Sequence, residues 1–384
     1  MQISLCIERG FQRLRGDLTN FLSTVIGNFV MALILGSVFY NLPDSSASFY
    51  SRGALLFFAI LMNGFSSMLE ILTLYAQRPI VEKHSQYALY HPFSEAVASM
   101  ICDLPAKILT AVSFNLSLYF MTNLRREPDA FFIFFLFSFA CTLAMSMIFR
   151  TIAAVSRTIY QALAPSALII LALVIYTGFA IPVRNMVSFM RWINYVNPIG
   201  YAFESLMINE FHGREVPCVN FIPSGPGYDN ITGLERSCIT PGAVPGRATV
   251  NGDAYINTSF EYYHSHLWRN LGIMIGITLF FLFTYLFASE KISSARSKGE
   301  VLVFRGKELR RRAGAHGDGE AGDSPGVVAE NRAPDVSPVI QRQTDIFHWK
   351  DVCYDITIKG EPRRILDNID GWVKPGTLTA LMVC

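Results

Sequence analysis

The sequence predicts a mostly α-helical, polytopic membrane protein with six transmembrane helices. Of its 384 residues, 51% are hydrophobic and only 16% are charged, whereas soluble domains average about a quarter charged residues. A bilayer core of about 30 Å needs roughly 20 predominantly apolar residues per helix. Six runs satisfy this: Leu18 to Tyr40, Ala54 to Tyr75, Ala96 to Met121, Ala130 to Phe149, Ile159 to Ile181 and Leu267 to Ser289.

The distribution of Lys and Arg predicts that both termini face the cytosol. Basic residues gather before the first span, in the second loop (Arg78 and Lys83), in the fourth loop (Arg150 and Arg157) and after the last span. Short cytoplasmic loops carry such an excess, although the two arginines of the third loop argue for the opposite assignment. Arginines ahead of a full-length span do not fit a signal peptide, so we expect the first helix to be retained.

Composition changes divide the chain into four parts. Residues 1–16 alternate apolar residues with arginine, which is typical of a helix along the membrane surface. Residues 17–290 form the six-span domain, with an external loop at about 182–266 that begins with an amphipathic helix pair, Trp192 to Phe211, dipping into the outer leaflet. Residues 291–344 are a cytosolic linker, largely disordered because it holds few large apolar residues.

The last part, residues 345–384, is predicted to begin a soluble α/β domain. Val352 to Ile358 alternates as a strand, Gly360 to Arg363 forms a turn, and Leu378 to Met382 is a buried type of strand. Some forty residues are too few to build the core of such a domain alone.

The long external loop carries two cysteines and two glycosylation sequons. Cys218 and Cys238 lie on the predicted external side, where disulfides persist, and Asn230 and Asn257 each begin an N-x-S/T sequon. These features predict an exposed lid stapled by a disulfide. The alternative is that two of the seven cysteines share this loop by chance.

Two charged segments on the predicted cytosolic side allow a functional and a structural interpretation. Gln77 to Pro92 is polar and suits a docking surface for a cytosolic partner, or is an ordinary polar loop. Asp103 and Lys107 in the third span are spaced i, i+4, so a mutual ion pair is the structural expectation. A role in transport is the alternative.

Several stretches resemble one family, the fungal pleiotropic drug resistance (PDR/CDR) transporters of the ABC G subfamily. Their membrane domain is of the ABC-2 type, and the resemblance covers nearly the whole chain apart from the linker. The matching stretches are Met31 to Tyr40 (MALILGSVFY), Phe57 to Glu70 (FFAILMNGFSSMLE), Arg78 to Pro92 (RPIVEKHSQYALYHP), Tyr176 to Pro182 (YTGFAIP), Asn197 to Gly213 (NPIGYAFESLMINEFHG) and Gly299 to Phe304.

The resemblance implies the first six-span block of a full transporter, followed by the first strands of the second nucleotide-binding domain. Tyr354, or alternatively Trp349, would stack on adenine, unless it is a plain core aromatic. No Walker A pattern, G-x-x-x-x-G-K-[ST], occurs in the chain, and the Walker B acid and signature loop have no counterpart. We therefore expect a truncated chain that does not hydrolyse ATP alone, whereas the complete transporter uses ATP and Mg²⁺.

The same resemblance implies roles for two sets of residues. The stretch from Gln77 to Pro92 would be the coupling element that receives motion from the nucleotide-binding domains. A substrate cavity would lie between this block and a second six-span domain. The coupling residues are Arg78, Glu82, Lys83 and His84, and the cavity residues are Asn63, Phe65, Leu171, Val174 and Phe179; plain helix packing is the alternative for the latter.

Together these features favour the membrane domain of an ATP-driven exporter of amphipathic xenobiotics, located in the plasma membrane. Its expected partners are the second six-span domain, two nucleotide-binding domains, membrane lipid and hydrophobic small molecules, and not nucleic acid. A lipid or sterol translocator of the same family and an inactive truncated gene product are the alternatives. A membrane enzyme or a metal site is not expected, because all seven histidines lie outside the predicted spans.

Overall fold

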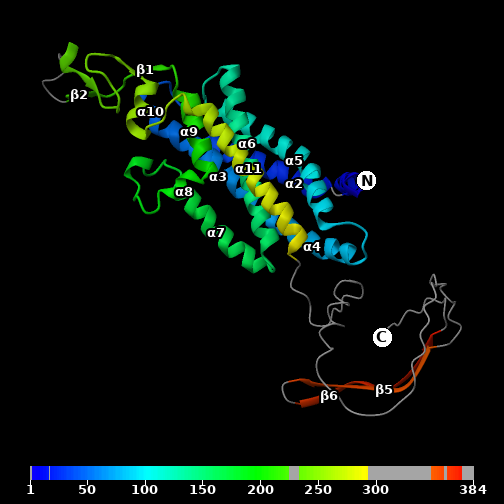
Figure 1. Ribbon diagram of the computed structural model, residues 1–384. Coiled ribbons are helices and arrows are strands. Elements are labelled where there is room, and N and C mark those ends of the chain that lie inside the picture. Colours follow the sequence, from blue (N-terminus) through cyan, green and yellow to red (C-terminus); the bar gives the residue numbers. More distant parts are fainter. Residues whose placement is uncertain (1, 17, 225–232, 293–346, 359–360, 374–384) are drawn as a thin grey trace, which may run out of the picture. The chain divides into compact units, whose positions relative to one another are not determined.

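The computed structural model describes residues 2–16, 18–224, 233–292, 347–358 and 361–373. The chain divides into two compact units, residues 1–306 and 307–384. The first unit is a helix bundle with a small lid of short strands and one helix, and the described part of the second is a β-hairpin (Figure 1). The mostly helical membrane fold that the composition predicts is confirmed.

Long apolar helices make up most of the first unit. Within the part of the chain that the structure describes, five candidate membrane spans are long and apolar enough, and one further apolar helix is shorter. The helices of the bundle are α1 (Gln2–Gly16), α2 (Leu18–Val38), α3 (Phe49–Met68), α4 (Glu70–Gln86), α5 (Pro92–Met121), α6 (Pro128–Val155), α7 (Ile159–Ile175), α8 (Trp192–Tyr195), α9 (Pro198–Phe211) and α11 (His266–Lys291).

The second span departs from its predicted bounds. The chain stays helical from α3 through α4, with an interruption at Leu69, so the expected polar loop after Gln77 is helical as far as Gln86. The hydroxyls of Ser66 and Ser67 both donate to the carbonyl of Asn63, and such back-bonding by serine bends helices. The polar stretch is therefore the last part of a long helical segment that is interrupted at Leu69.

The fifth span is shorter than predicted. Helix α7 ends at Ile175 after 17 residues, which at 1.5 Å per residue is about 25 Å long. The chain then turns, and Gly178 has φ +100°, a backbone conformation that residues with a side chain rarely adopt. The predicted continuation to Ile181 is therefore irregular backbone.

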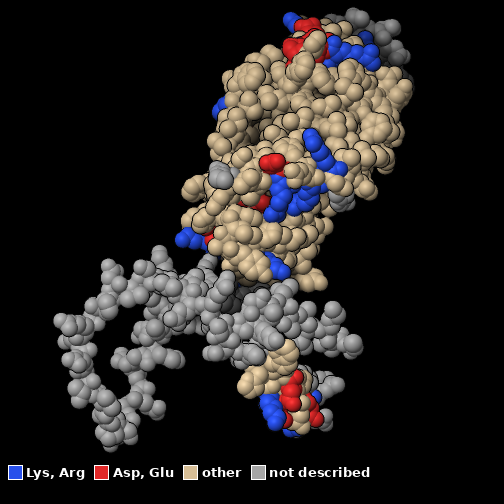
Figure 2. Space-filling view, turned by 90° about the vertical axis from the view of Figure 1, so that its right-hand side faces the viewer, with Lys and Arg blue, Asp and Glu red and all other residues tan. Residues whose placement is uncertain are grey.

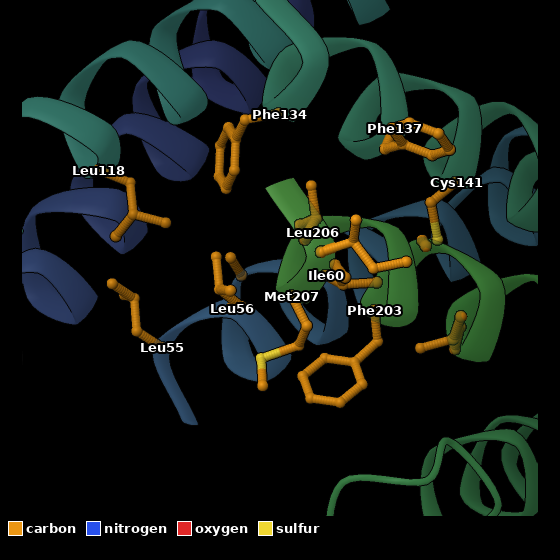
Figure 3. Close-up of a cluster of buried hydrophobic side chains, with 14 of the residues drawn as sticks. Leu55, Leu56, Ile60, Leu118, Phe134, Phe137, Cys141, Phe203, Leu206 and Met207 are labelled. Carbon is orange, nitrogen blue, oxygen red and sulfur yellow. The ribbon is translucent and has the colours of Figure 1, made fainter. Parts of the chain in front are cut away.

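The core of the bundle is built around α9. Eleven of its 14 residues are buried, and it packs against α3, α6, α7 and α11. The outer-leaflet helix pair expected at Trp192 to Phe211 is thus one turn of helix, α8, followed by a core helix. Figure 3 shows side chains of α9 (Phe203, Leu206 and Met207) among side chains of α3 (Leu55, Leu56 and Ile60) and of α6 (Phe134, Phe137 and Cys141).

The lid spans residues 212–265, and its described part contains two small sheets, the 3-10 helix η3 (Gly233–Glu235) and one α-helix. Strand β1 (Glu215–Pro217) pairs with β4 (Thr249–Asn251), and β2 (Phe221–Ile222) pairs with β3 (Ser237–Cys238), both antiparallel. Helix α10 (Gly252–Phe260) follows β4 and packs on α9. The side chain of Asn251 caps α10 by accepting from the amides of Asp253 and Ala254.

The second unit contains β5 (Phe347–Ile358) and β6 (Glu361–Val373), an antiparallel pair with Phe347 opposite Val373. Two residues of the predicted turn from Gly360 to Arg363 belong to a strand instead, because Pro362 and Arg363 lie in β6 and pair with Thr357 and Ile356. The predicted strand from Leu378 to Met382 and most of the predicted linker lie outside the described residues.

The surface of the bundle is largely apolar. Figure 2 shows charged residues in a few groups separated by a broad surface without Lys, Arg, Asp or Glu. Large exposed side chains stand along three helices, for example Ile34 in α2, Leu168 in α7 and Phe283 in α11. Such a continuous apolar surface suits contact with lipid or with another membrane domain.

Candidate functional site

The five predicted cavity residues lie on or beside α3 and α7, which pack against each other. The side chains of Phe65 and Leu171 are 44% and 55% exposed. Both side chains are therefore accessible to a ligand or to a neighbouring domain. Asn63 instead is buried and donates from Nδ2 to Ser138 Oγ at 2.8 Å. Val174 is half-buried against the core.

Phe179 belongs to an aromatic cluster at the end of α7. Its ring stacks on Phe57 at 4.9 Å and on Tyr50 at 5.7 Å, and meets Phe203 edge-on at 5.6 Å. The exposed ring of Tyr50 gives this cluster one open side. The structure therefore brings Phe179 to α3 and α9, whereas Phe65 and Leu171 face outward.

The predicted coupling residues share the last three turns of α4. Arg78 donates to the carbonyl oxygens of Ser156 at 2.5 Å and of Ile292 at 3.4 Å, and so connects α4 to the ends of α6 and α11. His84 Nδ1 lies 3.0 Å from the hydroxyl of Tyr90. Lys83 is exposed and Glu82 is partly buried. This end of α4 therefore touches three other elements.

A buried ionic network connects α4, α5 and α6 within the bundle. Glu70 lies 2.5 Å from Arg150 Nε and 3.0 Å from Lys107 Nζ. Arg150 also forms an ion pair with Asp103, and Ser146 Oγ donates to Glu70 at 2.7 Å. Each buried charge thus has an opposite charge and hydrogen bonds, which such sites require.

This network corrects two sequence predictions. Lys107 pairs with Glu70 and Asp103 pairs with Arg150, so the expected Asp103–Lys107 pair is replaced by contacts between helices. Arg150, which was assigned to the fourth loop, is inside α6 with its side chain 1% exposed. The spacing of charges along one helix could not reveal partners on other helices.

A second ionic cluster, the charge ring, joins the bundle to the lid. Arg52 in α3 and Arg214 in the lid each pair with Asp44 and with Glu210, and the four distances are 2.5 to 2.7 Å. The amide of Arg125 also donates to Glu210. This ring was not predicted, although Arg52 at the start of an apolar run and Glu210 within a later amphipathic segment are signals of buried partners.

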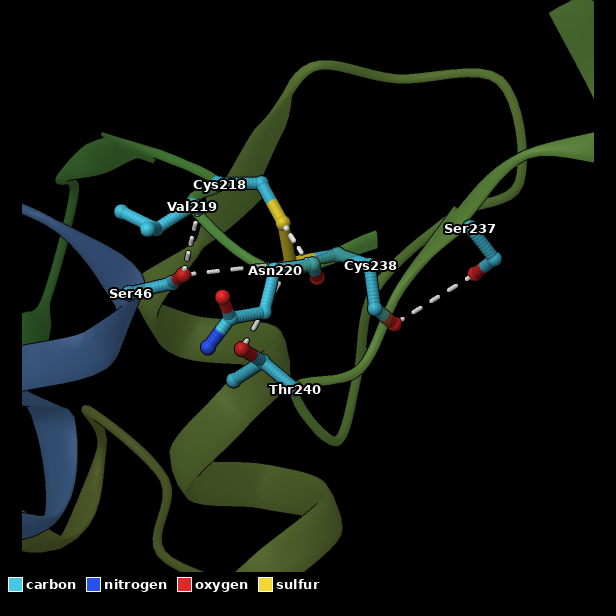
Figure 4. Close-up of a disulfide and its surroundings, with 7 residues drawn as sticks. All are labelled: Ser46, Cys218, Val219, Asn220, Ser237, Cys238 and Thr240. Atoms are coloured by element: carbon cyan, nitrogen blue, oxygen red, sulfur yellow. Dashed lines mark hydrogen bonds between the residues drawn. A yellow bond between two sulfur atoms is a disulfide. The ribbon is translucent and has the colours of Figure 1, made fainter. Parts of the chain in front are cut away.

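A hydrogen bond joins the lid to the segment before α3: the amide of Val219 donates to Ser46 Oγ at 3.2 Å. Within the lid, His212 Nδ1 lies 2.8 Å from Asp253. Beside Ser46, a disulfide joins Cys218 to Cys238 with their Cα atoms 6.0 Å apart (Figure 4). The predicted disulfide is confirmed.

The two sequons differ in what the structure describes. Asn257 lies in α10 and is partly buried, whereas Asn230 is outside the described residues. Whether either asparagine carries a glycan stays a prediction.

The hairpin carries both predicted adenine contacts. Tyr354 is 55% exposed, and the indole of Trp349 covers Gly371, where a Cβ would lie 2.2 Å from the ring. Tyr354 is thus the freer aromatic surface of the two. Among the described residues, no group of three or more His, Cys, Asp or Glu side chains is placed to hold a metal ion.

Comparison with known proteins identifies the bundle. The family described as "ABC-2 type transporter" matches residues 1–211, and the family described as "CDR ABC transporter" matches residues 222–313. The chain belongs to the ABC-2 type transporter family, and its further match is to the CDR group, as the resemblance implied.

Similar curated proteins are fungal ABC transporters. The chain is 60% identical to "ABC-type transporter eriD" of Hericium erinaceus over 100% of its own length, and 62% identical to "ABC multidrug transporter C" of Aspergillus fumigatus over 99%. It is 59% identical to "ABC multidrug transporter atrG" of Aspergillus oryzae. It spans only 27%, 26% and 25% of these relatives, or about a quarter of each.

Proposed function

We propose that this chain provides one transmembrane domain of an ATP-driven exporter of amphipathic xenobiotics. The observation that carries the proposal is its similarity, along nearly its whole length, to proteins named as multidrug transporters. The apolar bundle supports the proposal because it contains the buried charges that a moving membrane domain needs to keep paired.

The substrate path of this proposal runs along the exposed side of α3 and α7. Phe65 and Leu171 would face the second six-span domain across a cavity, with Phe179 and the open side of its aromatic cluster at one end. Val174 would contribute apolar wall, and Asn63 would position α3 through Ser138. Apolar walls with few polar groups suit varied amphipathic ligands.

Coupling would enter through the end of α4. Arg78, Glu82, Lys83 and His84 form its last turns, and Glu70 at its start is held by Arg150 and Lys107. A displacement of α4 would therefore move α5 and α6 as well. Nucleotide-binding domains elsewhere in the polypeptide would hold ATP and Mg²⁺, whose hydrolysis supplies the free energy, with Tyr354 or Trp349 against adenine.

The proposed location is the plasma membrane, with both termini in the cytosol and the lid outside. The disulfide supports this orientation of the lid, because disulfides persist in oxidising compartments. In this arrangement α1 and the end of α4 lie on the cytosolic side.

The test uses the complete transporter that contains this segment, in inside-out plasma-membrane vesicles. We expect ATP-dependent uptake of a fluorescent amphipathic dye, and a several-fold higher KM for Phe65→Ala but not for Leu22→Ala, a similarly exposed residue of α2. Movement of a fluorescent phospholipid or sterol without dye uptake would replace the proposal by a lipid translocator.

A further inference from the structure

A cavity of about 510 Å³ lies between α4, the start of α5 and the end of α11. Small-molecule sites typically have volumes of about 300 to 1,000 Å³. Its walls combine aliphatic side chains such as Leu74 and Val81 with the rings of Tyr75, Tyr90 and Tyr285. Size and lining therefore fit a drug-sized molecule with an apolar body.

The carboxylate of Glu95, in the first turn of α5, lines this cavity. Its side chain is 9% exposed, and its Oε2 has no hydrogen-bond partner among the described residues. The nearest ion pair is with Arg9, whose Nη2 lies 4.0 Å from Oε1 and whose side chain is 43% exposed. A buried carboxylate oxygen without a partner is costly and calls for a counter-ion.

Two uncharged neighbours of Glu95 are Cys6 and Tyr90. Burial and the Glu95 carboxylate raise the pKa of the Cys6 thiol, and both also raise the pKa of the Tyr90 hydroxyl. Both groups therefore stay protonated near neutral pH and supply no positive charge, so the half-exposed Arg9 is the cation that pairs with Glu95, and Oε2 is left without a hydrogen-bond partner among the described residues.

The rest of the lining carries charges of both signs. Glu82 and Glu290 are carboxylates, and Glu290 Oε1 lies 3.2 Å from His91 Nδ1. Arg78 and Lys291 are cations, and the guanidinium of Arg78 donates to the carbonyls of Ala153, Ser156 and Ile292. Within the described part of the chain, the buried oxygen of the lining that lacks a partner is that of Glu95, which a positively charged ligand satisfies and an anion of the same shape does not.

We propose that this cavity binds an amphipathic organic cation, with Glu95 as the counter-ion of its charged centre and the tyrosine and aliphatic side chains around its apolar body. The proposal rests on the proposed function, because it names cationic amphiphiles as a substrate class. It assigns them a site at the α1 end of the bundle, separate from the α3 and α7 face.

Two probes of nearly the same shape and opposite charge test it. The 384-residue chain in phosphatidylcholine nanodiscs is equilibrated with tetraphenylphosphonium or with tetraphenylborate, and free probe is measured by dialysis. We expect saturable binding of the phosphonium, and an affinity at least about tenfold lower in Glu95→Gln, which keeps the shape and removes the charge. The borate should show no saturable binding that depends on Glu95.

The control is Glu215→Gln, which removes an exposed carboxylate of the lid and should leave binding unchanged. A second variant, Ala154→Leu, fills part of the cavity from α6 without altering any charge. Like the loss of the Glu95 charge, it should weaken phosphonium binding, and here saturable binding should be abolished. Unchanged phosphonium affinity in Glu95→Gln overturns the proposal, as does equal saturable binding of both probes. If Glu95→Gln does not fold, unchanged binding in Ala154→Leu overturns it instead.

The binding measurement requires no ATP and no second domain. A negative result therefore removes the cation site and leaves the export proposal standing. Conversely, saturable phosphonium binding without dye uptake by the complete transporter would keep the site and remove the export function.

Discussion

Two arginines, Arg52 and Arg150, are almost fully buried in an apolar bundle, with side chains 2% and 1% exposed. Each is held by two carboxylates, Arg52 by Asp44 and Glu210, and Arg150 by Glu70 and Asp103. Desolvating a charge costs several kcal/mol, so these ions are tolerated only as complete sets. Removal of one partner therefore has a larger effect than its size suggests.

Replacement of Glu70 by glutamine tests this at the residue scale. Glu70→Gln leaves Lys107 without its carboxylate and Arg150 with one, so we expect a loss of about 3 to 5 kcal/mol in the free energy of unfolding. Denaturant unfolding of the purified chain in detergent, followed by tryptophan fluorescence, measures it.

The matched control is Glu127→Gln, which removes the half-exposed partner of Arg125. Exposed ion pairs contribute about 0 to 1 kcal/mol, so the control should change the free energy of unfolding very little. Equal effects of the two variants would show that the network contributes nothing beyond an exposed pair.

At the scale of elements, the lid is attached to α9 by close backbone contact. Gly252 at the start of α10 lies against the carbonyl of Phe211, where a Cβ would be 2.1 Å from the oxygen. Its amide donates to the carbonyl of Arg214 at 2.8 Å. Only glycine allows this approach, and the charge ring lies beside it on Arg214 and Glu210.

Gly252→Ala should therefore displace the lid from α9. We expect a loss of about 1 to 3 kcal/mol, the usual cost of overpacking, measured as a shift in thermal unfolding. Gly27→Ala in α2, where a Cβ meets nothing within 4 Å, should be neutral or slightly stabilising. A neutral Gly252→Ala would contradict the tight contact.

The disulfide is the second attachment of the lid. Replacing Cys218 and Cys238 together by serine removes a covalent link between residues 20 positions apart. The chain entropy that this link removes from the unfolded state corresponds to about 3 kcal/mol of stability. We expect faster proteolysis within the lid in the double variant, followed by mass spectrometry of the fragments. Cys353→Ser removes an exposed free thiol of the hairpin and should leave lid proteolysis unchanged.

At the scale of the whole molecule, the exposed apolar surfaces and the position of the lid indicate how the helix bundle lies in a membrane. Exposed apolar side chains cover α2, α7 and α11. The charge ring and the disulfide lie at the lid. The cavity that Glu95 lines lies beside α1 and α4. This separation along the bundle agrees with a chain that crosses a bilayer between two aqueous sides.

The external position of the lid can be measured by glycosylation. Expressed in a eukaryotic host, the chain should migrate faster after endoglycosidase treatment, and Asn230→Gln with Asn257→Gln should abolish the difference. Single variants show which sequon is used. A chain whose migration never changes with endoglycosidase would contradict an external lid.

Much of the fold could be predicted because membrane burial is a property of continuous segments. The apolar runs from Leu18 and from Ala130 predicted α2 and α6 to within a few residues at their starts, and the cysteine pair predicted the disulfide. The interruption of the helix at Leu69 could not be predicted, because it follows two serine hydroxyls that both donate to the carbonyl of Asn63. The burial of α9 depends on three or more helices surrounding it.

Residues of the candidate sites likewise divide into those that could be predicted from the sequence and those that could not. Arg78 and His84 were named from a resemblance, and the structure placed both in contact with other elements. Glu95, Arg52 and Glu210 went unassigned, because the sequence shows a charge near an apolar run but not the residue that faces it. The Asp103–Lys107 prediction was wrong for this reason: spacing along one helix competes with partners on its neighbours.

By itself, the sequence determined a mostly helical membrane protein, its approximate spans and the disulfide-linked loop, because length, hydropathy and the positions of cysteines are local properties of the chain, whereas the transporter family followed from a resemblance. Only the tertiary structure decided which buried charges neutralise one another and which carboxylate, that of Glu95, faces a cavity. Ion pairing depends on distances of a few ångströms between helices, and those distances exist only after the helices have packed.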